Sequence, residues 1–326
     1  MERVNLAVDV ESGDFGPQVI ISGIIEARRK NHFPFKVFIC GNEGRISEVI
    51  ASLGGDRQLG EYEIVACEDF INPGENRANV WKKQIDSPII RCIALQKQNK
   101  VDASISAGDT AILLGAALFI LGRSEGSVRP ALAAFLPTVQ KKPVLLLDVG
   151  ANLNCRSEHL ASFARMGEQY VKRFLAMKSP RVSLLNIGKE SVKGTKIIFE
   201  AEERVREECG NYTGFIEGNE VLSGNSDVVV CDGFCGNVLL KAFESFHQLA
   251  ESVLGNSVKS YPDLKKKMLV LDPEIYGGVP FLGIRGTVFK AHGRSSSRAI
   301  ANAVNAAVTA VERNAVGTIA RPKGDS

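Results

Sequence analysis

Five glycine-containing loops hold the side chains of this chain that are best suited to binding an anion. Each loop follows a short run with the composition of a β-strand, and together they cover residues 9–16, 106–110, 148–152, 186–190 and 232–237. Ligands of an open parallel sheet bind beyond the carboxyl ends of its strands, where a glycine lets backbone N–H groups approach a phosphate. A single loop of this kind is ordinary turn chemistry, but five together indicate a site for phosphate or a phosphate-bearing ligand.

The polar and glycine residues of these loops are the candidate ligand-binding positions, and one histidine that follows a later strand joins them. This histidine could reach the same edge of the sheet, although a hydrogen-bonded structural role is the safer interpretation. The candidates are Asp9, Gly13, Asp14, Ser106, Gly108, Asp109, Thr110, Asp148, Gly150, Asn152, Gly188, Asp232, Gly233, Gly236 and His292.

Two further residues have side chains that fit a reaction on phosphate. Lys193 lies between a predicted strand and a helix that we expect to begin near Thr195, and it is either a solvated surface lysine or a cation for phosphate. Asn237 opens the helix that follows Asp232, where it is either an N-terminal cap or a ligand contact. Asp232 is either a ligand contact or a residue whose side chain only fixes the turn.

Cys235 is the one thiol placed where it could act as a nucleophile. It stands at the predicted start of a helix, whose N-terminus could lower the pKa of the thiol. No histidine is tied to it by the sequence, so a small residue that fills a tight turn is the better explanation. The four histidines are isolated and the seven cysteines contain no CxxC pair, so we expect no metal site, no cofactor and reduced thiols.

Two common nucleotide-binding motifs are missing from the chain. There is no GxGxxG after the first predicted strand and no GxxxxGK[ST], which argues against an ordinary dinucleotide fold and a P-loop nucleotidase.

The loops must be positioned by short β-branched and apolar runs that alternate with longer helical patterns. This alternation predicts an α/β fold with a mostly parallel sheet, formed by a single domain over residues 1–326. The clearest helices are expected at 157–175, 238–254 and 296–313, and 255–278 reads as a projecting, irregular insertion. Strands are expected at 4–10, 35–40, 62–66, 103–106, 131–136, 144–148, 182–185, 214–217, 228–231 and 286–290.

Composition places the chain among soluble globular proteins. Of 326 residues, 44% are hydrophobic and 24% charged, and 40 Lys and Arg against 37 Asp and Glu leave a formal charge of +3. This balance argues against nucleic acid as the main partner. The longest apolar run, residues 111–121, is too short to cross a bilayer, and no signal peptide is visible, so we expect a cytoplasmic protein.

A set of motifs spread in order along nearly the whole chain resembles the bacterial phosphate acyltransferases of phospholipid synthesis. The combination is specific, although each piece is short. The matching segments are residues 105–108, 129–138, 145–152, 179–182, 232–238, 276–278 and 291–293.

The resemblance implies a three-layer α/β/α fold related to phosphotransacetylases and isopropylmalate-type dehydrogenases. It also implies a homodimer that associates peripherally with the inner face of the membrane, where a glycerol-3-phosphate acyltransferase is a further partner. The implied reaction is attack by inorganic phosphate on the thioester of an acyl-acyl carrier protein, without a covalent enzyme intermediate. Lys193 would hold the phosphate and Asn237 would stabilise the oxyanion, and a basic segment of the family matches Trp81, Lys82 and Lys83, followed by Ser87.

Several residues depart from the family's usual pattern. Glu11 adds a carboxylate to the first loop, Asp109 replaces an Asn, Ala111 a Gly, and Lys189 a Thr. The segment 255–278 is shorter than usual where the family carries an amphipathic membrane-contacting helix; its basic cluster suits either anionic lipid or a dimer-interface hairpin. Two alternative functions remain: a phosphotransacetylase-like enzyme that uses acyl-coenzyme A, and a noncatalytic lipid-synthesis scaffold at the membrane.

Overall fold

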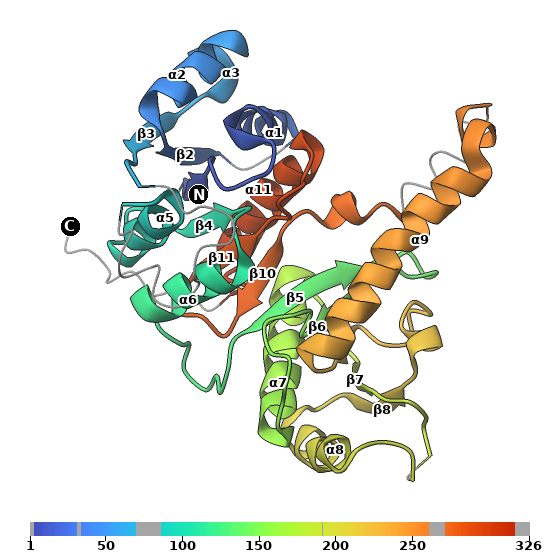
Figure 1. Cartoon of the computed structure of the whole chain (residues 1–326). Helices are drawn as coiled ribbons and strands as arrows, with labels where there is room; N and C mark the ends of the chain where they lie inside the picture. The colour runs from blue at the N-terminus through green and yellow to red at the C-terminus, as the bar shows by residue number, and fades with distance from the viewer. Residues whose placement is uncertain (1–2, 31–33, 70–85, 191, 261–270, 317–326) are drawn as a thin grey trace. The chain divides into compact units, whose positions relative to one another are not determined.

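The chain divides into two compact units. A computed structural model describes residues 3–30, 34–69, 86–190, 192–260 and 271–316 (Figure 1). One unit comprises Met1–Glu125 and Gly277–Ser326, and the other comprises Gly126–Tyr276. Within the described ranges, no helix has both the length and the apolar character needed to cross a membrane.

The first unit contains a mostly parallel set of strands in the order β3-β2-β1-β4-β11-β10. Neighbours from β3 to β11 pair in parallel, whereas β10 runs antiparallel to β11. Their bounds are β1 (Val4–Asp9), β2 (Phe35–Gly41), β3 (Tyr62–Ala66), β4 (Ala103–Ser106), β10 (Val279–Leu282) and β11 (Thr287–Lys290).

Two helix pairs cover these strands. All four residues of β4 are buried, which requires cover on both faces of the sheet. Helix α1 packs against α11, and Gly23 of α1 leaves room for Ile300 of α11, whose Cβ would lie 2.6 Å from a methyl group at position 23. Helix α5 packs against α6 in the same unit. The helices are α1 (Gly16–Lys30), α2 (Glu43–Ser52), α3 (Asp56–Leu59), α5 (Pro88–Lys97), α6 (Thr110–Ile120) and α11 (Ser297–Glu312).

The second unit has its own strands, in the order β5-β6-β9-β7-β8. The pairs from β6 to β8 are parallel, and β5 is antiparallel to β6. Helices α7 and α8 pack against each other (Figure 1). The elements are β5 (Ala131–Leu136), β6 (Val144–Leu147), α7 (Ser157–Phe174), β7 (Val182–Leu185), α8 (Lys196–Glu208), β8 (Tyr212–Ile216), η1 (Gly218–Glu220), β9 (Val228–Val230), α9 (Gly233–Ser260) and η3 (Pro273–Tyr276).

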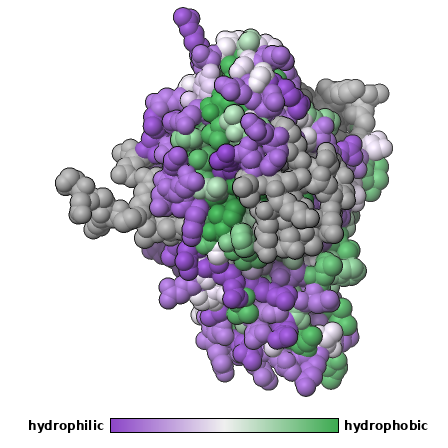
Figure 2. All heavy atoms as spheres, turned by 60° about the vertical axis from the view of Figure 1, so that its left-hand side comes forward, coloured by the Kyte–Doolittle hydropathy of each residue, from purple (hydrophilic) through white to green (hydrophobic). Residues whose placement is uncertain are grey.

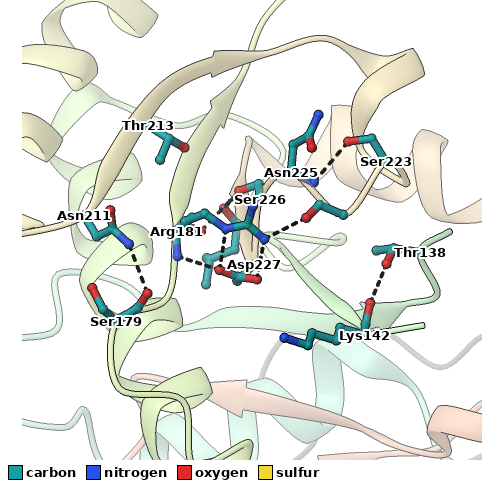
Figure 3. Close-up of polar contacts among 12 residues, drawn as sticks. Thr138, Lys142, Ser179, Arg181, Asn211, Thr213, Ser223, Asn225, Ser226 and Asp227 are labelled. Carbon is teal, nitrogen blue, oxygen red and sulfur yellow. Dashed lines mark hydrogen bonds and ion pairs between the residues drawn. The ribbon is translucent and has the colours of Figure 1, made fainter. Parts of the chain in front are cut away.

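A bidentate ion pair fixes the start of β7 on the start of β9. Arg181 Nε and Nη2 each donate to the Asp227 carboxylate at 3.0 Å, and Nη2 also donates to Gly224 O at 2.7 Å (Figure 3). Burial alone would raise the pKa of Asp227, but the hydrogen bonds from Arg181 outweigh it and lower that pKa. The pair therefore sets the register in which Val182 lies beside Val228.

The predicted strands all form, with small shifts at their ends, and β10 was not predicted. The prediction that 255–278 is irregular throughout is wrong at its start, because α9 continues to Ser260, and η3 adds a short helix near its end. Trp81, Lys82 and Lys83 lie outside the described residues. Of the basic cluster in 255–278, Lys259 belongs to the end of α9, whereas Lys265, Lys266 and Lys267 lie outside the described residues.

On the face of the molecule shown in Figure 2, most of the coloured surface is hydrophilic, with hydrophobic residues in smaller areas between the hydrophilic ones. Helix α9 is an exception, because Phe246, Leu249 and Val253 are all exposed along it. Their spacing of three and four residues places them on one side of the helix.

Candidate active site

A buried carboxylate organises the first loop of the first unit. Asp9 ends β1, and its Oδ1 accepts N–H bonds from Glu11 and Ser12 at 3.1 and 3.2 Å. Its Oδ2 accepts the Ser106 hydroxyl at 2.6 Å, and Ser106 Oγ accepts the Gly108 N–H at 3.0 Å. Burial raises the pKa of Asp9. Asp9 and Ser106 thus hold two of the candidate loops together through hydrogen bonds inside the protein.

A third segment joins these two loops. The Asp14 N–H donates to Gly293 O at 2.8 Å, and the Ala291 N–H donates to Ser106 O at 2.9 Å. A methyl group at Gly13 would lie 3.5 Å from the Ala107 methyl group, so the first two loops approach closely. The exposed His292 uses Nδ1 to accept the Arg294 N–H at 3.2 Å, within the same segment. The structure therefore gathers the candidates of this unit at one edge of its strands.

Asp109 and Glu11, the two acidic residues that depart from the family's usual pattern, both have hydrogen-bond partners nearby in the protein. Asp109 caps α6, since its Oδ1 accepts the N–H groups of Ala111 and Ile112 at 2.9 and 3.1 Å, and Thr110 is the first helical residue. The Glu11 carboxylate lies 2.6 Å from Arg45 Nη1 and accepts the Asn42 N–H at 3.1 Å. The added charge of Glu11 is thus paired within the protein.

Lys290 is a cation at this edge that the sequence analysis missed. It ends β11, and its Nζ donates to Ala107 O at 3.4 Å and also to Ala291 O. The signal was available, because Lys290 immediately precedes the Ala-His-Gly segment at the end of a predicted strand.

A second buried carboxylate organises the loop after β6 in the other unit. Asp148 accepts the N–H groups of Leu132 at 2.9 Å and Asn152 at 2.6 Å, and the Asn152 side-chain amide at 2.9 Å. Longer bonds come from the N–H groups of Gly150 and Ala151. Burial raises the pKa of Asp148. With both oxygens engaged, Asp148 shapes the loop, and a ligand would meet the loop's backbone instead.

The start of α9 packs directly on this loop. The Gly233 N–H donates to Asn152 O at 2.8 Å, and a methyl group at Gly236 would overlap Asp148 O. Gly150 has φ +130°, and a methyl group there would lie 3.6 Å from Asn237 Cγ. The structure thus places the Asn237 side chain beside Gly150, next to a loop held by Asp148.

The loop of Lys193 is closed by its own hydrogen bonds. Asn186 Nδ2 donates to Gly188 O at 3.0 Å and to Lys193 O at 2.7 Å. Lys193 Nζ lies 2.8 Å from Glu190 Oε1, and this hydrogen bond raises the pKa of Lys193. A methyl group at Gly188 would overlap the Lys193 side chain, so only glycine lets the lysine take this path. Lys193 is therefore a half-exposed, fully charged ammonium group.

Cys235 lies in the first turn of α9. Asp232 Oδ1 accepts its N–H at 2.8 Å, and Asp232 Oδ2 lies 3.5 Å from its Sγ. Burial and the Asp232 carboxylate raise the pKa of the thiol, which disfavours the thiolate needed for attack. Asp232 therefore fixes the turn, as one reading of the sequence proposed.

The second unit also holds a pocket, and Asn152 is the one lining residue that was among the predicted site residues. It has a volume of about 480 Å³ and is lined by Arg129, by residues 151–156 and by His159. Its one sequence signal is Arg156, because an arginine directly before a helix is an unusual choice.

Comparison with known proteins places the chain in a family. The family model described as "Fatty acid synthesis protein" matches residues 4–317. A curated protein named phosphate acyltransferase from Desulforudis audaxviator is 38% identical, over 99% of this chain and 97% of that protein. One with the same name from Wolinella succinogenes is 36% identical, over 95% of each. This chain belongs to the phosphate acyltransferase family.

Solved structures similar to this phosphate acyltransferase family member support the expected fold. A phosphotransacetylase from Streptococcus pyogenes aligns with a TM-score of 0.67 at 14% identity, over 95% of this chain and 94% of that one. A putative 4-hydroxythreonine-4-phosphate dehydrogenase from Salmonella typhimurium aligns with a TM-score of 0.58 at 16% identity, over 94% and 99%. The predicted α/β class, and its relation to phosphotransacetylases and a group of dehydrogenases, are confirmed.

Proposed function

We propose that this chain is an acyltransferase that moves a long-chain acyl group from acyl-acyl carrier protein to inorganic phosphate, giving acyl-phosphate for phospholipid synthesis. The observation that carries the proposal is the near full-length identity of 34–38% to proteins named phosphate acyltransferase. The geometry around Asn237 and Lys193 supports it, because it offers amide donors and a cation without an activated nucleophile of the enzyme's own.

The proposed reaction is direct attack. A phosphate oxygen forms a bond to the thioester carbonyl carbon, the carbonyl oxygen becomes an oxyanion, and the C–S bond then breaks to release the carrier thiolate. Asn237 Nδ2 is the donor that would stabilise the oxyanion, because the N–H groups of Gly233, Cys235 and Gly236 in the first turn of α9 are already hydrogen-bonded within the protein. Donors of this kind are effective because their frame is already in place, here through Asp148 and Gly236.

Lys193 is proposed to hold the phosphate. Its raised pKa keeps the ammonium group charged at neutral pH, which suits an anionic nucleophile. Glu190 Oε1 pairs with Lys193 Nζ in the structure, so phosphate would have to displace this carboxylate. The loops of the first unit that contain Asp9 and Ser106 are also proposed to bind substrate.

The proposed partners are acyl carrier protein, inorganic phosphate and a second copy of the chain. The exposed apolar side chains Phe246, Leu249 and Val253 on α9 support an interface there. We also propose a cytoplasmic location with peripheral contact to the inner membrane face, where a glycerol-3-phosphate acyltransferase would consume the acyl-phosphate. Sedimentation equilibrium of the full chain tests the dimer, and co-sedimentation with anionic vesicles tests the membrane contact.

The experiment that tests the function compares thioesters. The full chain is incubated with inorganic phosphate and either acyl-acyl carrier protein or acyl-coenzyme A, and acyl-phosphate is measured by mass spectrometry. The proposal expects product mainly from the carrier-protein thioester. Product mainly from acyl-coenzyme A would favour a phosphotransacetylase-like enzyme, and binding of the carrier protein without any product would favour a scaffold.

A further inference from the structure

The start of α7 carries a charge that contradicts helix capping rules. Arg156 is the N-cap of α7, and its side chain makes no capping hydrogen bond. Residues that accept hydrogen bonds are preferred there, and the partial positive charge of a helix N-terminus disfavours a cation. Natural proteins break such local rules mainly at functional sites. The His159 N–H donates to Arg156 O at 3.0 Å, whereas the N–H groups of Ser157 and Glu158 have no hydrogen-bond partner among the described residues and are available to a ligand.

A second arginine lines the same pocket. Arg129 shares the pocket of about 480 Å³ with Arg156, and among the described residues its guanidinium group has no ion-pair partner. The wall beside it is rigid, because Asn152 Nδ2 donates to Pro130 O at 2.8 Å. Among the described residues, Arg156 has an ion pair with Glu158 alone, at 3.6 Å, which leaves Arg129, Arg156 and Glu158 together with an excess of positive charge.

A buried histidine completes the lining. The His159 side chain is only 7% exposed, and its Nδ1 accepts the Arg156 N–H at 3.0 Å, so the neutral ring carries its hydrogen on Nε2. Burial and the charge of Arg129 lower the pKa of His159, so the ring is neutral at neutral pH. A neutral ring adds a donor near Glu158, whose Oε1 lies 3.7 Å from Nε2.

We infer that this pocket binds a phosphate group of one of the two substrates, between Arg129 and Arg156 at the start of α7. Two guanidinium forks and a helix N-terminus are the groups that proteins use to recognise phosphate oxygens. The inference rests on the proposed function for the identity of the substrates. The group is either the phosphodiester of the carrier protein's phosphopantetheine arm or the inorganic phosphate acceptor, and in the second case this pocket, not Lys193, holds the acceptor.

Binding of inorganic phosphate to the full chain is the first test. Calorimetry compares the wild type with Arg129→Ala and Arg156→Ala, and Arg204→Ala, an exposed arginine of α8 outside the pocket, is the matched control. If the pocket holds the acceptor, each pocket variant binds phosphate about tenfold or more weakly, as for a lost charged hydrogen bond, and the control is unchanged. Phosphate then also raises the pKa of His159 in the wild type, measured by NMR titration with His159→Gln for assignment.

Kinetics distinguish the two sources of phosphate. If the pocket binds the inorganic phosphate acceptor, Arg129→Ala and Arg156→Ala have a higher KM for phosphate and an unchanged KM for the thioester. Occupation by the pantetheine arm raises the KM for acyl-acyl carrier protein, and this effect is absent with an acyl-N-acetylcysteamine thioester, which has no phosphate.

The inference is overturned if Arg129→Ala and Arg156→Ala match Arg204→Ala in phosphate affinity and in both KM values. Melting temperatures equal to that of the wild type establish that the variants are folded. If the wild type makes no acyl-phosphate but its phosphate affinity depends on Arg129, the pocket stands and the proposed function fails.

Discussion

The Lys193 side chain is exposed, although its charge is paired with a carboxylate. Its ammonium group pairs with Glu190 at 2.8 Å and remains half-exposed, so a phosphate can replace the glutamate without burying a new charge. Within the part of the chain that the structure describes, Lys193 forms no other ion pair, and its path depends on the absence of a side chain at Gly188. This arrangement suits a residue that binds an incoming anion better than one that stabilises the fold.

We predict that Lys193→Ala folds normally and lowers kcat/KM by about a hundredfold, the typical effect of removing a preorganised charged donor. The loss should appear mainly in steps that involve phosphate. The matched control is Lys196→Ala, because Lys196 begins α8 and makes only an exposed pair with Glu200 at 3.6 Å. Equal activity of the two variants would remove Lys193 from the reaction.

Cys235 should be replaceable. Serine keeps the backbone N–H that Asp232 accepts and offers a hydroxyl in place of a thiol whose pKa is raised. We therefore predict that Cys235→Ser keeps turnover within about threefold of the wild type, as for a substitution worth less than 1 kcal/mol. An acyl group trapped on Cys235 and detected by mass spectrometry would contradict direct attack by phosphate.

At the scale of elements, the decisive contact is that of α9 with the loop after β6. Gly236 faces Asp148 O so closely that any side chain would force the two segments apart. We predict that Gly236→Ala lowers the free energy of unfolding by about 1–3 kcal/mol, the usual cost of overpacking, and also lowers activity through Asn237. Gly210→Ala, with no atom within 4 Å of the new methyl group, should change neither; urea denaturation makes the comparison.

The pairing of β7 with β9 depends on an ion pair whose strength varies with pH. Arg181→Ala removes three side-chain hydrogen bonds and leaves the Asp227 carboxylate buried, at a cost of about 1–3 kcal/mol near neutral pH. The pKa of Asp227 is lowered in the folded protein, so its contribution is complete above the ordinary value of 3.8 and is lost as the pH falls through the lower folded value.

The difference in unfolding free energy between the wild type and Arg181→Ala should therefore be constant from about pH 7 to pH 5 and shrink below about pH 4. Arg206→Ala is the control, because its exposed pair with Glu202 is worth only about 0.5 kcal/mol or less. A difference that grows as the pH falls would contradict the assigned role of Asp227.

The strands of the sheet were predicted well where a run of neighbouring residues in the sequence was enough to define them. The strands before Asp9, Ser106, Asp148 and Asp232 are short, apolar and followed by glycine, so their ends were visible. Strand β10 was missed because four residues that include Pro280 give no periodicity, and its antiparallel pairing with β11 is a tertiary contact. The roles of Asp9 and Asp148 as loop organisers also depended on tertiary hydrogen bonds, as did the pocket of Arg129.

At the scale of the whole molecule, the same pattern of hydrogen bonds occurs in both units. A buried aspartate at a strand end accepts the N–H groups of the loop that follows, Asp9 after β1 and Asp148 after β6. In each unit the loop so shaped meets a second glycine-containing segment. The result is a pair of loops whose shape is fixed in advance by hydrogen bonds within the protein, which is the arrangement expected of an enzyme that works by positioning two substrates.

The most direct test of this account is the stoichiometry of acyl transfer. The full chain is mixed with long-chain acyl-acyl carrier protein and inorganic phosphate, and acyl-phosphate and free carrier thiol are measured together for the wild type and Asn237→Ala. The account predicts one acyl-phosphate for each thiol released, and a rate about a hundredfold lower in folded Asn237→Ala. Thiol release without acyl-phosphate, or an unchanged rate in Asn237→Ala, would contradict it.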